Sequence, residues 1–348
     1  MSKTNLEIGR RAPVRRVSFI GWCRLHQEKL WWLHSLYALM LGIGVMWLGK
    51  RNFAYVRVAI IHLSFIWLSS LILPKLLNHP RLSRRWAARL QLVVNFFNKN
   101  FYQQMLFFVL PIYYASTTLG SLNVVFVVLV GLSALLSTLD LIYDRHLSVR
   151  RGLAASFFAF NLFALINVML PILWSVSNTE TTRISGALAF AGFLSLAYPA
   201  SQSMIRRIAL VFGIGFIILG VVELGRAFIP PAPLRLIGAQ FGTDFDRESW
   251  RMVSPLTKLN SAGPLRLDGL TAIKAPLGLR EKLQHRWYEN GNPVCTTPFY
   301  NVVGGREEGF RLWTGCAFSN IPTNVELRLD VQTEGGQLVG RAKLKSGS

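Results

Sequence analysis

A long apolar run near the middle of the chain constrains the fold more than any other feature. The 22 residues 208–229 are nearly all apolar, with Arg206 and Arg207 before them and Pro230 and Pro231 directly after them. As a helix rising about 1.5 Å per residue, such a run is long enough to cross a hydrocarbon core of about 30 Å. The run therefore predicts a membrane-crossing helix that leads into a soluble domain.

Composition supports a membrane location for the first part of the chain. Of the 348 residues, 51% are hydrophobic and only 16% are charged, against about 25% charged residues in soluble proteins. The net charge of +21 is uneven, since residues 1–229 hold 23 Lys or Arg and 6 Asp or Glu, whereas residues 230–348 hold 15 and 11. Because the basic excess lies in the apolar part, we expect no nucleic-acid partner.

Seven apolar stretches precede residue 230, at 31–49, 53–73, 101–119, 122–143, 153–176, 184–199 and 208–229. They predict a polytopic α-helical membrane domain of about seven transmembrane helices over 31–229, behind a basic cytoplasmic tail at 1–30. With the N-terminus inside, the inner segments carry 18 Lys or Arg and the outer ones carry three, as the positive-inside rule requires. We expect a bacterial inner-membrane protein, surrounded by membrane lipid, whose C-terminal domain is periplasmic.

In the remaining chain, hydrophobic and polar residues alternate with a period of two. Val325, Leu327, Leu329 and Val331 alternate with charged residues, which is typical of a strand with one buried face. Similar runs occur at 265–273, 282–288, 293–303, 309–318 and 337–345. They predict a small all-β sandwich, immunoglobulin-like in size, over 264–348, joined to the membrane domain by a linker at 230–263.

A register argument brings two cysteines together. If residues 304–307 form a hairpin loop, Val303 faces Glu308 and Cys295 faces Cys316. In an oxidising compartment such a pair forms a disulfide that contributes about 3 kcal/mol in the chain-entropy model. Two buried free thiols are the alternative, since facing cysteines in a sheet often have strained geometry.

The same register places five side chains on one face of a three-stranded sheet: His285, Trp287, Tyr300, Arg311 and Trp313. If exposed, this face is an aromatic and basic platform that can stack on sugar rings or bind a partner chain. If buried, it is the core face, with the tryptophans packed between sheets. The sequence leaves both alternatives open.

Four ionisable residues in the apolar stretches are candidates for transport. Asp140 and Asp144 lie four residues apart near the inner end of the fourth stretch, and Glu223 and Arg226 lie three apart in the last one. Burying charge in lipid is costly, so such groups often mark function. Interfacial helix ends and a structural ion pair explain the same residues.

Familiar catalytic and metal-binding motifs are missing. The sequence has no H-E-x-x-H and no G-x-S-x-G, and its three cysteines lack zinc-site spacing. We expect no metal and no cofactor, and we lean against an enzyme.

Several short strings stand out in the chain, at 285–288 with Gly291, at 309–311, at 335–338 and, in the membrane part, at Pro111 and 229–234. Together they resemble a known bacterial family, the "domain of unknown function 2914". That family has no assigned activity, so the resemblance implies an architecture and transfers no catalytic residue.

Two functions are consistent with these patterns. In the first, the periplasmic sandwich binds an envelope ligand, either a glycan or a membrane protein partner. In the second, the transmembrane bundle transports a solute or carries a lipid or lipid-linked glycan, through Asp140, Asp144, Glu223 and Arg226.

Overall fold

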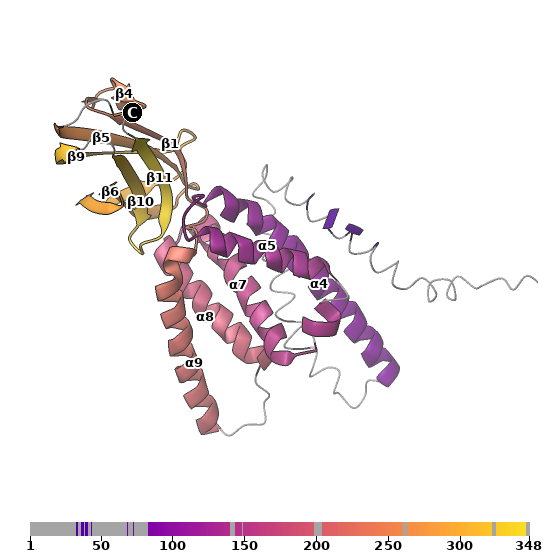
Figure 1. Ribbon diagram of the computed structural model, residues 1–348. Coiled ribbons are helices and arrows are strands. Elements are labelled where there is room, and N and C mark those ends of the chain that lie inside the picture. Colours follow the sequence, from indigo (N-terminus) through magenta and orange to yellow (C-terminus); the bar gives the residue numbers. More distant parts are fainter. Residues whose placement is uncertain are drawn as a thin grey trace, which may run out of the picture.

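The computed structural model describes residues 83–139, 143–147, 149–197, 204–259, 263–321 and 325–345, with eight isolated positions between 33 and 72. These residues form a helical unit (84–228) and a β unit (235–345), which lies against one end of the helices (Figure 1). The chain's C-terminal end is in the β unit, and the last helix leads into it (Figure 1).

Five α-helices make up the described helical unit: α4 (Arg84–Ala115), α5 (Val124–Thr138), α7 (Arg151–Trp174), α8 (Asn178–Ala197) and α9 (Met204–Leu224). A short π-helix η1 (Tyr143–Leu147) precedes α7, and a 3-10 turn η2 (Gly225–Phe228) follows α9. At the start of α4, the Ser83 hydroxyl accepts a hydrogen bond from the Trp86 N–H at 3.4 Å, which satisfies one of the unpaired donors of the first turn.

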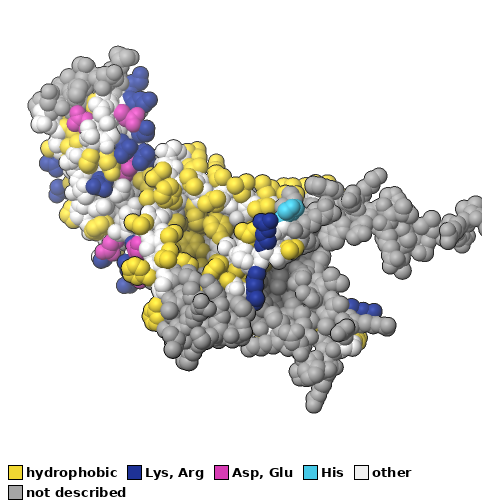
Figure 2. Space-filling view, turned by 60° about the horizontal axis from the view of Figure 1, so that its bottom comes forward, with side chains coloured by type: hydrophobic (Ala, Val, Ile, Leu, Met, Phe, Trp, Pro, Cys, Tyr) yellow, Lys and Arg dark blue, Asp and Glu magenta, His cyan; other side chains and the backbone are white. Residues whose placement is uncertain are grey.

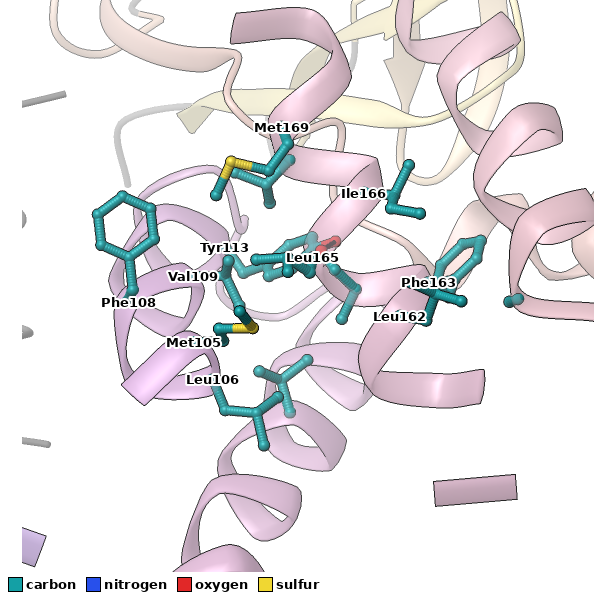
Figure 3. Packing of buried hydrophobic residues seen from close by; sticks show 14 of the residues in the cluster. Met105, Leu106, Phe108, Val109, Tyr113, Leu162, Phe163, Leu165, Ile166 and Met169 are labelled. Atoms are coloured by element: carbon teal, nitrogen blue, oxygen red, sulfur yellow. Dashed lines mark hydrogen bonds between the residues drawn. The ribbon is translucent and has the colours of Figure 1, made fainter. Parts of the chain in front are cut away.

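The helices share one apolar core. Tyr113, Val109, Leu165 and Leu162 point toward one another between α4 and α7 (Figure 3). The Tyr113 hydroxyl donates a hydrogen bond of 2.8 Å to the Ala164 carbonyl, so its polar end is satisfied inside the core. This shared core explains why long stretches of these helices are apolar.

The prediction of about seven transmembrane helices is wrong. Within the described part of the chain, α7 is the one helix that is long and apolar enough to cross a membrane, and 61% of its apolar window is buried. The apolar helix α5 has only 15 residues, too few for a core of about 30 Å. Counting apolar runs failed because buried core helices give the same signal as spans. The predicted stretches 31–49 and 53–73 and the tail 1–30 lie almost wholly outside the described residues.

The β unit contains two antiparallel sheets. The first has the strand order β4 (Pro255–Leu256), β1 (Arg235–Gly242), β5 (Gly263–Lys274), β9 (Phe310–Ile321). The second has the order β11 (Leu338–Lys345), β10 (Glu326–Thr333), β6 (Arg280–Glu289), β7 (Asn292–Thr296), with β8 (Tyr300–Val303) also paired to β6. Phe241 and Leu267 from the first sheet meet Trp287 and Leu329 from the second in a common core, as the inner faces of packed sheets do.

Residues 230–263, expected as a linker, instead contain four strands. β1 pairs with β5 over its whole length and is an interior strand of the first sheet. The strands β2 (Phe245–Asp246) and β3 (Arg251–Met252) form a separate two-stranded sheet, whose Phe245 stacks on Trp313 of β9. The sequence argument missed β1 because its glycines and polar residues hide the period of two.

Buried hydrogen bonds join the two units. The Glu281 Oε2 of β6 accepts bonds from the Asn178 main-chain N at 2.6 Å and from its Nδ2 at 3.1 Å, at the start of α8. The Asn123 Nδ2 donates to the Leu338 carbonyl at 3.2 Å, and the Gln337 Nε2 donates to the Ile229 carbonyl at 3.1 Å. The β unit is therefore docked on the helices through buried hydrogen bonds.

Candidate binding groove

The five residues predicted to share one face are divided between two sheets. His285 and Trp287 lie on β6 of the second sheet, and both are fully buried. Arg311 and Trp313 lie on β9 of the first sheet, and Tyr300 lies on β8, where all three reach the surface. They do not form the single face that the sequence register predicted.

His285 connects the two sheets from inside. Its Nε2 lies 2.8 Å from the Thr271 Oγ1 of β5, and its Nδ1 lies 2.6 Å from the Thr314 Oγ1 of β9. Burial lowers the pKa of His285 to about 3, because the interior disfavours the charged imidazolium. A neutral, fully bonded histidine in this place is a structural group and is not available to a ligand.

Trp287 fills the centre of the β unit. Its ring makes edge contacts with Phe241 and Phe318, with ring centroids 5.8 and 6.1 Å apart. Cys295 of β7 is its partner across the strand pair, and Cys295 is joined to Cys316 of β9 by a disulfide with 6.2 Å between the Cα atoms. The disulfide thus ties the two sheets together beside a buried tryptophan, as in immunoglobulin domains.

The hairpin at 304–307, from which the pairing of Cys295 with Cys316 is predicted, is not present. β8 pairs with β6, with Val303 opposite Arg280, and not with β9. The Gly304 N–H bonds to the Leu279 carbonyl at 2.8 Å, so the chain after β8 runs against the loop between β5 and β6. The two cysteines meet because the chain crosses from one sheet to the other between them, not because they face each other in one sheet.

An open groove of about 550 Å³ runs along the edge of the β unit where the disulfide joins the sheets. One wall is the strand β9 over residues 310–315, and the other is the segment 295–298 with Tyr300 and Asn301. Trp250 lies at the groove and also lines a neighbouring hollow of about 710 Å³ over residues 306–311. Three of the five predicted residues line the groove: Tyr300, Arg311 and Trp313.

Arg311 holds Trp250 in place. Its Nη1 donates to the Trp250 carbonyl at 3.1 Å, and its Nη2 contacts the Glu308 carboxylate at 2.9 Å. Trp250 is 46% exposed and has a φ of 53°, an unusual backbone conformation for a bulky residue. Such residues persist where surrounding contacts fix them, often at functional sites.

Trp250 is the groove residue that sequence reasoning missed. It lies in the stretch 230–263 that is predicted to be a linker, where no period of two reveals it. The one available signal is the closeness of Phe245, Arg247 and Trp250 in an otherwise polar stretch.

Trp313 is packed more tightly than the sequence suggested. The Phe245 ring stacks on it with centroids 4.8 Å apart and planes 12° apart, and the Arg247 guanidinium lies 5.2 Å from its centroid. Behind it lies Asp268, whose pKa is raised by burial and lowered again in part by Arg266. The Trp313 ring is therefore already engaged in contacts within the protein.

Of the four transport candidates, the structure describes Asp144, Glu223 and Arg226. Glu223 Oε1 accepts bonds from the Arg226 Nη2 at 2.7 Å and the Arg183 Nε at 2.9 Å, so it is part of an ion-pair network at the junction of the units. Asp140 lies outside the described residues, and Asp144 lies on η1. No cluster of three or more His, Cys, Asp and Glu side chains suited to a metal ion occurs in the described segments.

Residues 16–272 match a family described as "Family of unknown function (DUF5924)". The chain belongs to DUF5924. The resemblance to the "domain of unknown function 2914" named the wrong family, although the broader expectation of a family without assigned activity is confirmed. The DUF5924 match ends within β5, so it covers Trp250 but not the groove walls at 295–301 and 310–315.

Other comparisons add little to this DUF5924 protein. No curated protein matches the chain. Among solved structures, the Pseudomonas fluorescens alkylpurine DNA glycosylase AlkC bound to DNA containing an abasic site analog is similar at 9% identity and a TM-score of 0.22, over 78% of this chain and 84% of that chain. At this TM-score the likeness supports no conclusion about fold or function.

Proposed function

We propose that this DUF5924 protein is a membrane-associated binding protein whose β unit takes an envelope ligand, a glycan or a partner protein, in the groove beside β9. The observation that carries the proposal is the convergence of Trp250, Tyr300 and Arg311 on one open groove. Exposed aromatic rings beside an arginine are the residue types that dominate binding surfaces.

The helical unit supports a membrane association. The α5 side chains Val125, Leu129, Leu132 and Leu135 are about half exposed and recur every three or four residues, so they form one apolar stripe. The helical surface is largely apolar where its residues are described (Figure 2). Apolar patches of this extent are rare on soluble monomers, so we propose that the stripe contacts lipid.

The disulfide supports an oxidising compartment for the β unit. Disulfides persist in the bacterial periplasm and outside cells, and they are rare in the cytosol. An oxidising compartment favours a periplasmic β unit on a bacterial inner membrane. Transport is the weaker alternative, because Glu223 and Arg226 are already paired with each other and no described feature favours it over binding.

Photo-crosslinking in cells tests the proposed function. A photoreactive amino acid replaces Tyr300 or Trp250 in the groove, and in a control protein it replaces the exposed Lys258 on the same unit. We expect light-dependent adducts from the groove positions only. Equal adduct formation at Lys258, or none at any position in folded protein, would contradict the proposal.

A further inference from the structure

The contacts that the Trp313 ring already makes argue against sugar stacking in the centre of the groove. Stacking on a sugar needs a free aromatic face. The Phe245 ring and the Arg247 guanidinium both lie over the Trp313 ring. Of the predicted platform, only Tyr300, at 38% exposure, offers a partly exposed aromatic ring, and Trp250 offers a second one.

The main chain of β9 is the more extensive feature that the groove offers. β9 is the last strand of the first sheet and pairs only with β5 within the described residues. All six residues from Phe310 to Gly315 line the groove. Side chains of successive residues point to opposite faces of a strand, so these six residues have their main chain in common at the groove. The groove therefore follows the free edge of the strand, over about 20 Å at about 3.3 Å per residue.

The opposite wall does not satisfy this edge. The Thr297 N–H bonds to the His285 carbonyl at 3.0 Å, so this segment is tied back to β6. Pro298, which follows it, has no N–H to donate. The one charged side chain on the β9 stretch 310–315, Arg311, is bonded to Trp250 and Glu308. An unpaired edge of this kind, without a proline, is a template for another strand.

Two guanidinium groups lie beside residues that line the groove. Arg247 lies over Trp313, and Arg306 lies 5.3 Å from the Phe310 ring centroid. Both side chains are exposed, and neither forms a salt bridge in the described part of the chain. They complement a ligand that carries negative charge near the ends of the 310–315 edge.

We propose that the groove binds an extended peptide with an acidic side chain, which adds to β9 as an extra strand. Main-chain hydrogen bonds to β9 supply affinity, while Trp250, Tyr300 and the two arginines select side chains. This inference rests on the proposed binding function and names its ligand class. A glycan in the same groove is the competing outcome.

The test uses a display library of random twelve-residue peptides, selected on the full-length protein in lipid nanodiscs. Selected peptides should be enriched in Asp or Glu. The double variant Arg247→Glu and Arg306→Glu should bind them about tenfold more weakly, because each exposed charge contributes modestly. The matched control Lys258→Glu should bind them normally.

Hydrogen exchange on the complex then separates strand addition from other binding modes. A bound peptide should slow exchange at main-chain amides within 310–315 and leave the other sheet edge, β11 at 338–345, unchanged. Absence of any selected peptide, or a peptide that binds without protecting β9, would overturn the inference. If groove crosslinks form and contain saccharide, the proposed binding function stands, and only the inference of a peptide ligand is overturned.

Discussion

At the scale of single residues, Glu281 is the side chain on which the junction depends most. It is only 4% exposed, and its carboxylate caps the first turn of α8 through Asn178. A carboxylate at a helix N-terminus is favourable, yet burial raises the pKa of Glu281 above its usual range despite the two bonds from Asn178. The nearby Glu334 raises it further.

We predict that Glu281 makes the protein less stable as the pH rises. A carboxyl whose pKa is higher in the folded state binds its proton more tightly there, so its stabilisation is full below pH 4.5 and is lost as the pH rises through the raised pKa. Glu281→Gln should flatten this part of the pH dependence, measured by thermal unfolding between pH 4 and pH 7.

Glu281→Ala is the informative contrast to the glutamine variant. It leaves the buried Asn178 N–H groups without an acceptor, and we expect a loss of about 1–3 kcal/mol in the free energy of unfolding at any pH. Equal stability of the alanine and glutamine variants would show that the bonds to Asn178 contribute nothing.

The sequence could predict which residues alternate but not which sheet each strand joins. His285 and Trp287 share a parity on β6, and Arg311 and Trp313 share one on β9, as expected. Because β6 and β9 belong to opposite sheets, one pair faces the core and the other faces out. Which sheet a strand joins is decided by contacts between distant residues, so local periodicity carries no signal for it.

At the scale of elements, the alternating sequence pattern predicts where long strands lie but not where they break or which strand each pairs with. The run predicted at 293–303 is two strands, β7 and β8, separated at Pro298, and both pair with β6. A proline cannot donate within a strand, which favours such a break. The short strands β2, β3 and β4 have two residues each, too few for any periodicity to show.

The disulfide between β7 and β9 gives an element-scale prediction. It closes a loop with a sequence separation of 21, and the chain-entropy model gives about 3 kcal/mol for such a loop. Replacing Cys295 and Cys316 together by serine should lower the free energy of unfolding by about 2–4 kcal/mol in urea titrations.

Reduction of the native protein provides the control for that prediction. A dithiol should destabilise the native chain to a similar extent and leave the double serine variant unchanged. Faster hydrogen exchange should appear first at 295–301 and 310–315, the two groove walls that the disulfide joins. Unchanged exchange at these walls after reduction would contradict the assigned role.

At the scale of the whole molecule, the distribution of apolar surface separates the two units. The helical unit exposes the α5 stripe and several α9 side chains, including Phe216 at 82% exposure. In the β unit, apolar side chains are mostly enclosed between the sheets. The contrast fits one unit in contact with lipid and one in contact with water.

We predict that the protein stays with the membrane fraction after an alkaline carbonate wash. Leu132→Lys on the α5 stripe should reduce the share of the protein in the membrane fraction, because placing a charged side chain in contact with lipid is costly. The control Val253→Lys changes an equally exposed apolar residue of the β unit and should have little effect. A fully soluble protein would contradict the lipid contact.

The Glu281 cap also has a consequence for the order in which the chain matures. Asn178 and Glu281 are 103 residues apart, and a ribosome releases the α8 segment well before it reaches β6. From Asn178, further buried hydrogen bonds lead through Thr182 and Asn167 to Tyr113. Until β6 is synthesised, the nascent α8 therefore lacks its cap, and chains truncated before residue 281 should be early targets of quality-control proteases.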